Sequence, residues 1–264
     1  MRKIALVTGG ASGIGRAIAN ELSARGVRVT IADIDGDGGE RAAKEIGATA
    51  VRLDVTDADA VLDAVSGLRE RHGRLDFVFN NAGIAVGGTV EELTLDHWNR
   101  AIDVNLRGVV HGVRAAYPIM VEQGYGRIVN TASLAGLTPA PLMVPYTATK
   151  HAVVGLSLGL RAEAARYGVK VHAVCPGFID TPLLDNTNPG LAQTRTGAHA
   201  REAALMVQGR LYPAGTLARD IMRGIARDRA LIVAPSSARR VWRFVRLAPG
   251  LSTWLAGVGA IRIR

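Results

Sequence analysis

The chain has 264 residues, of which 48% are hydrophobic and 21% charged, a balance that can bury one sizeable core and argues against disorder. Its single cysteine, Cys175, excludes an internal disulfide. The net charge of +9 comes entirely from Arg210–Arg264, which holds eleven arginines and two acids, so the rest of the chain is neutral on balance and nucleic-acid binding is not expected.

The N-terminus is charged and then apolar, as a secretion signal would be. Its apolar run, Ile4–Val7, ends at Thr8-Gly9-Gly10 and is too short for the core of a signal peptide. No stretch approaches the ~20 apolar residues of a membrane span. We therefore expect a cytoplasmic protein.

Short apolar or β-branched runs alternate along the chain with longer segments of helical period. The expected strands are Ile4–Val7, Val27–Ala32, Ala50–Leu53, Phe77–Asn80, Gly126–Asn130, Val169–Val174 and Leu231–Ala234. The expected helices are Ile14–Ala24, Asp59–Arg71, Leu95–Met120, Tyr146–Arg166 and Thr216–Arg227. This repetition predicts a single α/β domain with right-handed crossovers and a mostly parallel sheet covered on both faces.

A glycine-rich segment, Thr8-Gly9-Gly10-Ala11-Ser12-Gly13-Ile14-Gly15, follows the first strand and opens the first helix. Glycines here permit a tight turn, let backbone N–H groups approach a pyrophosphate and let the helix pack on the strand. A plain turn before a capped helix is the alternative, but the position favours dinucleotide binding. The expected cofactor contacts in this segment are Gly9, Ser12, Gly13, Ile14 and Gly15.

An acid, Asp33, follows the second strand, where a ribose-binding carboxylate is needed. It can accept hydrogen bonds from ribose hydroxyls and would repel a 2′-phosphate. A turn-forming role is the alternative, because Asp33-Ile34-Asp35-Gly36 has a loop-like composition. Arg16 and Arg28 could attract a phosphate, yet the acid favours NAD over NADP as cofactor.

Two further strand ends carry candidate contacts. After the third strand, Asp54, followed by Val55, could bond the adenine amino group or cap the next helix, for which residues 56 and 57 are better placed. After the fourth strand, small residues stand where open α/β sheets bind ligands, although a plain turn would also explain them. The contacts expected there are Asn81, Ala82 and Gly83.

The segment Tyr146-Thr147-Ala148-Thr149-Lys150 places a phenol and an ammonium on one face of a helix. A phenol pKa of about 10 is too high for a general base at neutral pH. A neighbouring cation and a positively charged nicotinamide would lower that pKa by stabilising the phenolate. Packing plus a solvated charge is the alternative interpretation of the pair.

Two polar residues complete the candidate catalytic set. Ser133 follows the fifth strand, where its hydroxyl could orient a substrate oxygen or simply cap a turn. Asn105 lies in the apolar stretch Ile102–Leu106, where an amide needs a polar partner. A local kink with a bound water or an ordinary buried hydrogen bond would satisfy it.

Together these residues resemble the short-chain dehydrogenase/reductase family. The motifs TGGASGIG, NNAG, YTATK and Cys175-Pro176-Gly177, with Asn105 and Ser133, occur in the family's order and spacing from about Lys3 to Pro235. The resemblance implies a Rossmann-like doubly wound parallel sheet of about seven strands that binds NAD(P) across its carboxyl edge. Residues 1–235 would form the catalytic domain, and 236–264 a C-terminal helical extension packed on it.

The resemblance also implies roles for the candidate residues. Tyr146 would be the acid/base, and Lys150 would bind the nicotinamide ribose and lower the pKa of Tyr146. Ser133 would hold the reacting oxygen, and Asn105 would keep a water in the proton relay. Further cofactor contacts in the loop after the sixth strand would be Pro176, Gly177, Ile179 and Thr181, the last two at the nicotinamide carboxamide.

The family usually forms dimers or tetramers through its long helices, so we expect a homodimer or homotetramer. We expect no metal site. The expected reaction interconverts a secondary alcohol and a ketone with NAD. The segment Leu183–Tyr212, expected to form a lid, is rich in apolar residues and suggests a lipophilic substrate such as a steroid, retinoid or long-chain alcohol. The alternatives are a carrier-linked 3-oxoacyl reductase, which normally prefers NADP, and a non-catalytic NAD-sensing module, which would not need Tyr146.

Many bacterial members of this family end soon after the last strand, whereas this chain continues. Arg239, Arg243 and Arg246 fall on one helical face, opposite Trp242 and Val245. After Pro249-Gly250, four apolar residues recur at helical spacing: Leu251, Trp254, Leu255 and Val258. This pattern suits peripheral contact with an anionic membrane. The alternative is that the helices cover the substrate cleft or join an oligomer interface.

Overall fold

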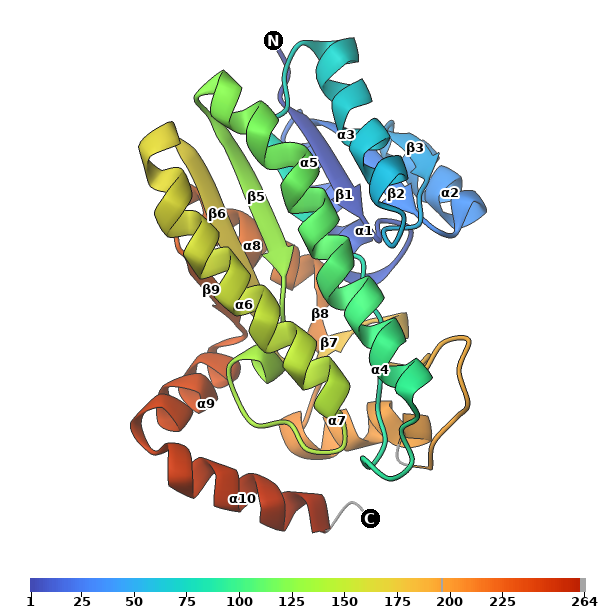
Figure 1. The fold of residues 1–264 in the computed structure, drawn as a ribbon, viewed down its shortest axis with the longest axis vertical. Helices are drawn as coiled ribbons and strands as arrows, with labels where there is room; N and C mark the ends of the chain where they lie inside the picture. Colours follow the sequence, from blue (N-terminus) through green and yellow to red (C-terminus); the bar gives the residue numbers. More distant parts are fainter. Residues whose placement is uncertain (196, 262–264) are drawn as a thin grey trace.

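A seven-stranded sheet forms the centre of the molecule, with all strands parallel and in the order β3-β2-β1-β4-β5-β6-β9 (Figure 1). The computed structural model describes residues 1–195 and 197–261. The strands are β1 Ile4–Thr8, β2 Arg28–Asp33, β3 Thr49–Arg52, β4 Phe77–Asn80, β5 Gly126–Thr131, β6 Val169–Pro176 and β9 Leu231–Ala234. The expected seven strands and the Rossmann-like α/β fold are confirmed. A small second sheet pairs β7 Ile179–Asp180 with β8 Tyr212–Pro213.

Helices cover both faces of the large sheet, as the nearly all-apolar strands predict. One face carries α1 Gly13–Ala24, α2 Gly36–Ile46 and α8 Ala214–Ala226. The other face carries α3 Ala58–His72, α5 Gly108–Gln123 and α6 Val144–Ala164. The remaining helices are α4 Leu95–Ile102, α7 Ala200–Gln208, α9 Ser236–Leu247 and α10 Pro249–Ile261.

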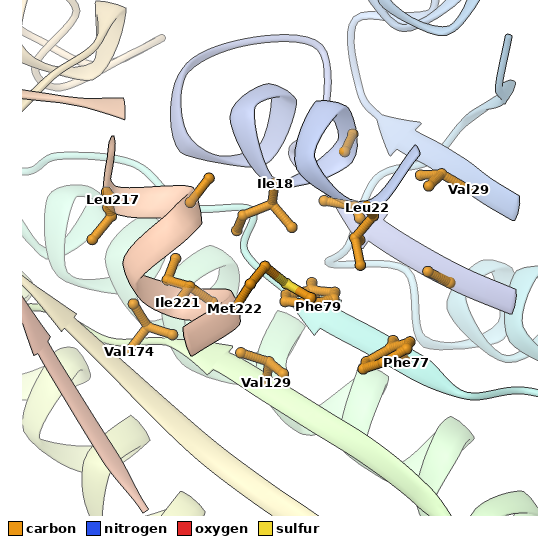
Figure 2. Close-up of a cluster of buried hydrophobic side chains, with 14 of the residues drawn as sticks. Ile18, Leu22, Val29, Phe77, Phe79, Val129, Val174, Leu217, Ile221 and Met222 are labelled. Carbon is orange, nitrogen blue, oxygen red and sulfur yellow. The ribbon is translucent and has the colours of Figure 1, made fainter. Parts of the chain in front are cut away.

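Alternate residues of each strand pack into different layers. In β1, Ala5 and Val7 face α1 and α8, whereas Ile4 and Leu6 face α3 and α5. Figure 2 shows the first of these layers, with Phe79 of β4 beneath the side chains of α1 and α8. Full burial of each large apolar side chain contributes about 1.5–3 kcal/mol, so the two layers stabilise the sheet from both faces.

Two helical segments differ from expectation. Helix α2 was not expected, because three glycines in its first turn resemble a loop; the Asp35 carboxylate caps it by accepting a hydrogen bond from the Gly38 amide, and Gly47 ends it with a left-handed conformation (φ 64°). The expected single helix Leu95–Met120 is instead α4, a π-helical turn over Asp103–Arg107, and α5. The wider turn is a recurrent feature of functional sites.

The strand order reverses between β1 and β4, and open α/β sheets bind ligands beyond the carboxyl ends of the strands at such a reversal. The turn after β1 and the segment after β4 both lie at this point. The expected lid, residues 183–212 apart from Thr196, which is not among the described residues, contains α7 and short 3-10 turns beyond the same edge (Figure 1). The fold therefore brings the candidate residues to one end of the sheet.

The C-terminal segment forms two helices. Helix α9 follows β9 directly, and α10 begins at Pro249 itself. Trp242 and Ala238 of α9 pack against the core beside β9. Arg262 and Arg264 lie outside the described residues. Within the described part of the chain, no helix is long and apolar enough to cross a membrane.

Candidate active site

The glycine-rich turn after β1 joins three segments of the site. Gly9 has a φ of +64°, and a methyl group added there would lie 2.8 Å from the Ala82 Cα. Gly13 has a φ of +54°, and an added methyl group would lie 3.2 Å from the Thr181 side chain. Both positions therefore need glycine for backbone conformation and for close approach. The turn touches both the segment after β4 and the loop after β6.

The turn also exposes the start of α1. Ser12 occupies the N-cap position in an extended conformation, but within this described segment its side chain caps no amide, and the first turn holds no acid. Gly15 fits against Gly9, because a methyl group at Gly15 would lie 2.0 Å from the Gly9 carbonyl oxygen. The backbone amides near Ile14 therefore lie at the positive end of the helix dipole without a hydrogen bond from the Ser12 side chain. This arrangement suits an anion such as a pyrophosphate.

Asp33 stands beside this turn at the end of β2. One carboxylate oxygen accepts a hydrogen bond from the Ala11 amide at 2.9 Å, and the other accepts one from the Asp35 amide at 3.1 Å. The two cations that could attract a phosphate are engaged elsewhere. Arg16 is paired with Glu45, and Arg28 contacts His72 Nδ1 at 3.2 Å.

Asp54 does not cap the helix that follows it. Its Oδ1 accepts hydrogen bonds from the Thr56 amide and hydroxyl, at 2.9 and 2.8 Å, whereas Asp57 caps α3. Burial raises the pKa of Asp54, but the Thr56 hydrogen bonds and the Arg100 charge outweigh burial, so its pKa lies below the usual value. Val55 is buried, and its carbonyl accepts a hydrogen bond from His111 at the start of α5.

The segment after β4 is fixed by Thr8, a residue that the sequence analysis did not single out. The Thr8 hydroxyl oxygen accepts hydrogen bonds from the amides of Asn81 and Ala82, at 2.9 and 3.1 Å. The Asn81 side chain donates a hydrogen bond through Nδ2 to the Thr8 backbone carbonyl at 3.0 Å. These hydrogen bonds join the end of β1 to the segment after β4.

Asn105 lies within the π-helical turn and is completely buried. Its side chain donates to the Ile84 carbonyl at 3.0 Å and accepts from the Ile84 amide at 2.9 Å. A methyl group at Gly83 would lie 3.0 Å from Asn105 Oδ1 and 3.5 Å from Lys150 Nζ. The backbone of Ile84 is therefore the polar partner that a buried Asn105 side chain needs, and Asn105 lies in a local π-helical turn.

Lys150 and Tyr146 lie one turn apart on α6, as their spacing predicts. Lys150 is 3% exposed, and its ammonium group donates a hydrogen bond to the Thr131 carbonyl at the end of β5, at 2.9 Å. The Lys150 nitrogen lies 5.5 Å from the centre of the Tyr146 ring. Thr131 is therefore a second structural residue that sequence reasoning missed, since no sequence signal identifies a carbonyl acceptor.

Burial dominates the electrostatics of this pair. It lowers the pKa of Lys150 from 10.5 to about 8. It raises the pKa of the Tyr146 phenol, and a hydrogen bond with the Ser133 side chain offsets only part of that rise. Removing a phenolate from water thus outweighs the stabilising hydrogen bond of Ser133. The lowering of the Tyr146 pKa by Lys150 together with a bound nicotinamide stays a prediction.

Ser133 follows β5 and begins a short 3-10 turn, where its hydroxyl oxygen accepts a hydrogen bond from the Ala135 amide at 3.1 Å. That turn fits closely on α6, because a methyl group at Gly136 would lie 2.5 Å from the Lys150 carbonyl oxygen. The four candidate catalytic residues therefore meet at the carboxyl ends of β4 and β5.

The loop after β6 reaches the glycine turn through Thr181, but Ile179 is placed differently. The Ile179 side chain is buried in the core with α1 and α8, which leaves only its backbone for a ligand. Pro176 pairs with Ala234 of β9, and the Gly177 amide donates to the Ala234 carbonyl at 2.8 Å. The loop is thus anchored to the edge of the sheet.

Both ends of α7 hold this loop in place, which the sequence analysis did not foresee. At the C-terminal end, the Gln208 side chain accepts from the Phe178 amide at 2.9 Å and donates to the Phe178 carbonyl at 2.7 Å. At the N-terminal end, Arg201 pairs with Asp180 and Asp185. No spacing in the sequence reveals these long-range partners.

Comparison with known proteins agrees with this geometry. Residues 3–192 match the family model described as short chain dehydrogenase. The chain is 38% identical over 193 residues to levodione reductase of Leifsonia aquatica, covering 70% of this chain and 72% of that enzyme. It is 34% identical over 205 residues to D-beta-hydroxybutyrate dehydrogenase of Rhizobium meliloti, covering 74% of this chain and 78% of that enzyme.

A solved structure matches over nearly the whole length. The short chain dehydrogenase/reductase from Burkholderia phymatum, determined in complex with NAD, has a TM-score of 0.86 and 32% identity and covers 95% of both chains. The family model spans well over half of this sequence, and the matching enzymes cover most of it. The chain therefore belongs to the short-chain dehydrogenase/reductase family and is an oxidoreductase that acts on alcohol or ketone groups.

Proposed function

We propose that this enzyme interconverts an uncharged secondary alcohol and its ketone with NAD, using Asn105, Ser133, Tyr146 and Lys150 as its catalytic groups. The observation that carries the proposal is the convergence of these residues beside the glycine turn at the strand-order reversal. Ligands of open α/β sheets bind at this point. The buried Lys150 and the Ser133–Tyr146 hydrogen bond give the site a proton-transfer group rather than a plain ligand contact.

The residues present fit a dinucleotide. Gly9 and Gly13 let the turn approach Ala82 and Thr181 closely, and the amides after Ser12 are free of a side-chain cap in the described segment. Asp33 would accept hydrogen bonds from ribose hydroxyls, and the pairing of Arg16 with Glu45 disfavours a 2′-phosphate. Bound NAD would supply the carbon that accepts or gives the hydride.

Tyr146 would take the alcohol proton on its phenolic oxygen during oxidation and return it during reduction. Ser133 would donate a hydrogen bond to the reacting oxygen and hold it toward that phenol. The raised pKa of Tyr146 suits the protonated, donating form that ketone reduction requires. Oxidation therefore needs the positive charge of Lys150, together with that of the cofactor, to stabilise the phenolate.

Asn105 would act through the backbone, because Ile84 uses both ends of its side chain. In a π-helical turn the main-chain carbonyls are displaced from the regular α-helical ladder. The side chain of Asn105 would thus fix the turn, and its carbonyl would hold the relay water. This assignment differs from a direct side-chain contact with water.

The lid supports an uncharged substrate. Three of its four basic side chains are already paired with acids: Arg195 with Glu92, His199 with Glu202, and Arg201 with Asp180 and Asp185. A carboxylate substrate would need such a cation for itself. The half-buried leucines of the segment favour a lipophilic alcohol or ketone, the class that includes steroids, retinoids and long-chain alcohols: Leu183, Leu184, Leu191 and Leu211.

The test is a screen of NAD and NADP, at equal concentrations, against sterols, retinols, cyclic and aliphatic secondary alcohols and 3-hydroxybutyrate. We expect turnover with NAD and an uncharged alcohol, followed by the absorbance of the reduced cofactor. A higher kcat/KM with 3-hydroxybutyrate would overturn the substrate assignment. NADP preference would favour the 3-oxoacyl reductase, and NAD binding without turnover of any substrate would favour the sensor.

Cofactor choice is tested separately at Asp33. We expect Asp33→Asn to lower the NAD-over-NADP ratio of kcat/KM roughly tenfold, because the carboxylate no longer repels a 2′-phosphate or binds ribose. Asp37→Asn, which removes an exposed acid of the neighbouring helix α2, is the matched control and should leave the ratio unchanged. An equal effect of the two substitutions would show that only general charge is sensed.

A further inference from the structure

Helices α9 and α10 expose apolar side chains to solvent. Leu247 is 87% exposed and Trp254 is 63% exposed, both unusual for large apolar residues. The α9–α10 surface consists of six exposed apolar residues and two exposed arginines: Val241, Phe244, Leu247, Leu251, Trp254, Leu255, Arg240 and Arg243. Exposed apolar residues gathered on two consecutive helices indicate a binding surface rather than scattered exposure.

The exposed residues of α9 lie on a helix that also packs against the core. In α9, Ala238 and Trp242 pack on the core, so Val241, Phe244 and Leu247 belong to a different face. In α10, Ser252 is buried, whereas Leu251 and Trp254 are outside. Helix α9 therefore uses one face for the core and leaves another apolar face uncovered, whereas α10 packs on α9 and exposes its apolar residues.

The α9–α10 surface carries positive charge only. Residues 229–264 contain seven arginines and no acidic residue. Arg239 donates to the Val233 carbonyl and Arg246 lies over the Trp242 ring, but in the described residues Arg240 and Arg243 form no ion pair. Apolar side chains flanked by unpaired arginines complement an anionic phospholipid surface, where tryptophan is also favoured.

We infer that the α9–α10 surface docks this enzyme on the surface of a bilayer that contains anionic phospholipid. A second copy of the chain fits less well. In a two-fold contact the same patch meets itself, which would place Arg240 and Arg243 against each other without an acid between them. An anionic bilayer neutralises the arginines and buries the apolar residues at once.

The position of the surface fits its proposed role. Figure 1 shows α9 and α10 at the end of the molecule to which the strands point, the end that also carries the lid helix α7. Met206 of α7 is 75% exposed at this end. The docked enzyme would hold its substrate end near the bilayer. Docking itself does not depend on the proposed cofactor or substrate.

The test measures sedimentation of the purified full chain with vesicles of phosphatidylcholine alone, and with a three-to-one mixture of phosphatidylcholine and phosphatidylglycerol. We expect binding to the mixture only, weakened by added salt. Each arginine removed should lower the partition coefficient about fivefold, so R240Q/R243Q should lower it about 25-fold. For the original chain we expect a blue shift of tryptophan emission with anionic vesicles. Trp254→Ser should release the protein and abolish this shift.

Matched controls use exposed residues elsewhere. R71Q/R227Q removes the same charge, and Leu62→Ser removes an exposed apolar residue from α3. Both should bind as the original chain does. Equal binding to both vesicle types, or equal loss in the controls, would overturn the proposal. So would absence of vesicle binding with self-association that R240Q/R243Q abolishes. Because binding is measured without turnover, failure here leaves the proposed reaction standing.

Discussion

Lys150 is a buried cation that sits between a carbonyl and an aromatic ring. Its ammonium group donates to the Thr131 carbonyl and lies over the face of Tyr146, in the manner of a weak cation–π contact. Neither contact repays full desolvation, which is why its pKa falls to about 8. A residue kept at such a cost to stability is expected to serve a function.

Replacement of Tyr146 by Phe removes the proposed proton carrier and leaves the ring. We expect kcat to fall about 10²- to 10⁴-fold, the usual contribution of general acid–base catalysis, while NADH binding measured by fluorescence stays within about twofold. Tyr125→Phe, at an exposed tyrosine remote from the site, is the control and should retain full activity. Undiminished turnover in Tyr146→Phe would remove the phenol from the mechanism.

Lys150 also predicts how stability depends on pH. Unfolded Lys150 keeps its proton up to pH 10.5, whereas folded Lys150 releases it near pH 8. Between these values the unfolded chain binds more protons, so the free energy of unfolding rises with pH relative to Lys150→Met, by about 1.4 kcal/mol per pH unit.

Urea titrations of the two proteins across this interval measure that difference. Lys44→Met, at an exposed lysine of α2, should show no such slope relative to the original chain. A constant difference between the original chain and Lys150→Met at every pH would mean that the folded lysine titrates normally.

At the scale of elements, helix α7 and the loop after β6 behave as one unit. Gln208 occupies both backbone groups of Phe178, and Arg201 holds Asp180 and Asp185. The loop also carries Thr181, which touches the glycine turn. We therefore expect motion of α7 to be transmitted to the proposed cofactor site.

Removal of the Gln208 side chain should uncouple this unit. We expect Gln208→Ala to raise amide hydrogen exchange in residues 178–185 and 200–208 together, because the Phe178 amide and carbonyl lose their partner. The KM for NAD should rise several-fold, with a smaller change in kcat. Glu202→Gln on the same helix is the control. Faster exchange confined to α7 would show that the helix and the loop move independently.

At the scale of the whole molecule, α9 and α10 bring exposed apolar residues and arginines together at one end of the molecule (Figure 1). Helix α9 is part of the folded core through Trp242, whereas α10 packs on α9 and keeps its apolar face outside. The two helices therefore contribute unequally to stability. This asymmetry separates a docking segment from the catalytic body.

Deletion of residues 249–264 should leave the fold intact. We expect thermal unfolding to shift less in the truncated chain than in Trp242→Ala, for which loss of core contacts costs about 2 kcal/mol. Circular dichroism melts of both variants show which of them unfolds at the lower temperature. A truncated chain that melts below Trp242→Ala would place α10 in the core.

The sequence predicted the strands because a sheet covered on both faces requires apolar runs, which are visible locally. It also located Tyr146, Lys150 and the glycine turn, since helical spacing and a strand–turn–helix order are local properties. It missed α2, whose glycines resemble a loop, and the π-turn, in which Asn105 contacts the distant Ile84.

What only the tertiary structure decided depends on contacts between residues far apart in the chain. The partners of Lys150, Thr8 and Gln208, the placement of the Ile179 side chain in the core and the raised pKa of Tyr146 all follow from burial and long-range packing. The sequence specifies which chemical groups the side chains carry. The desolvation that tunes them exists only after the chain folds, because it is set by neighbours that no spacing specifies.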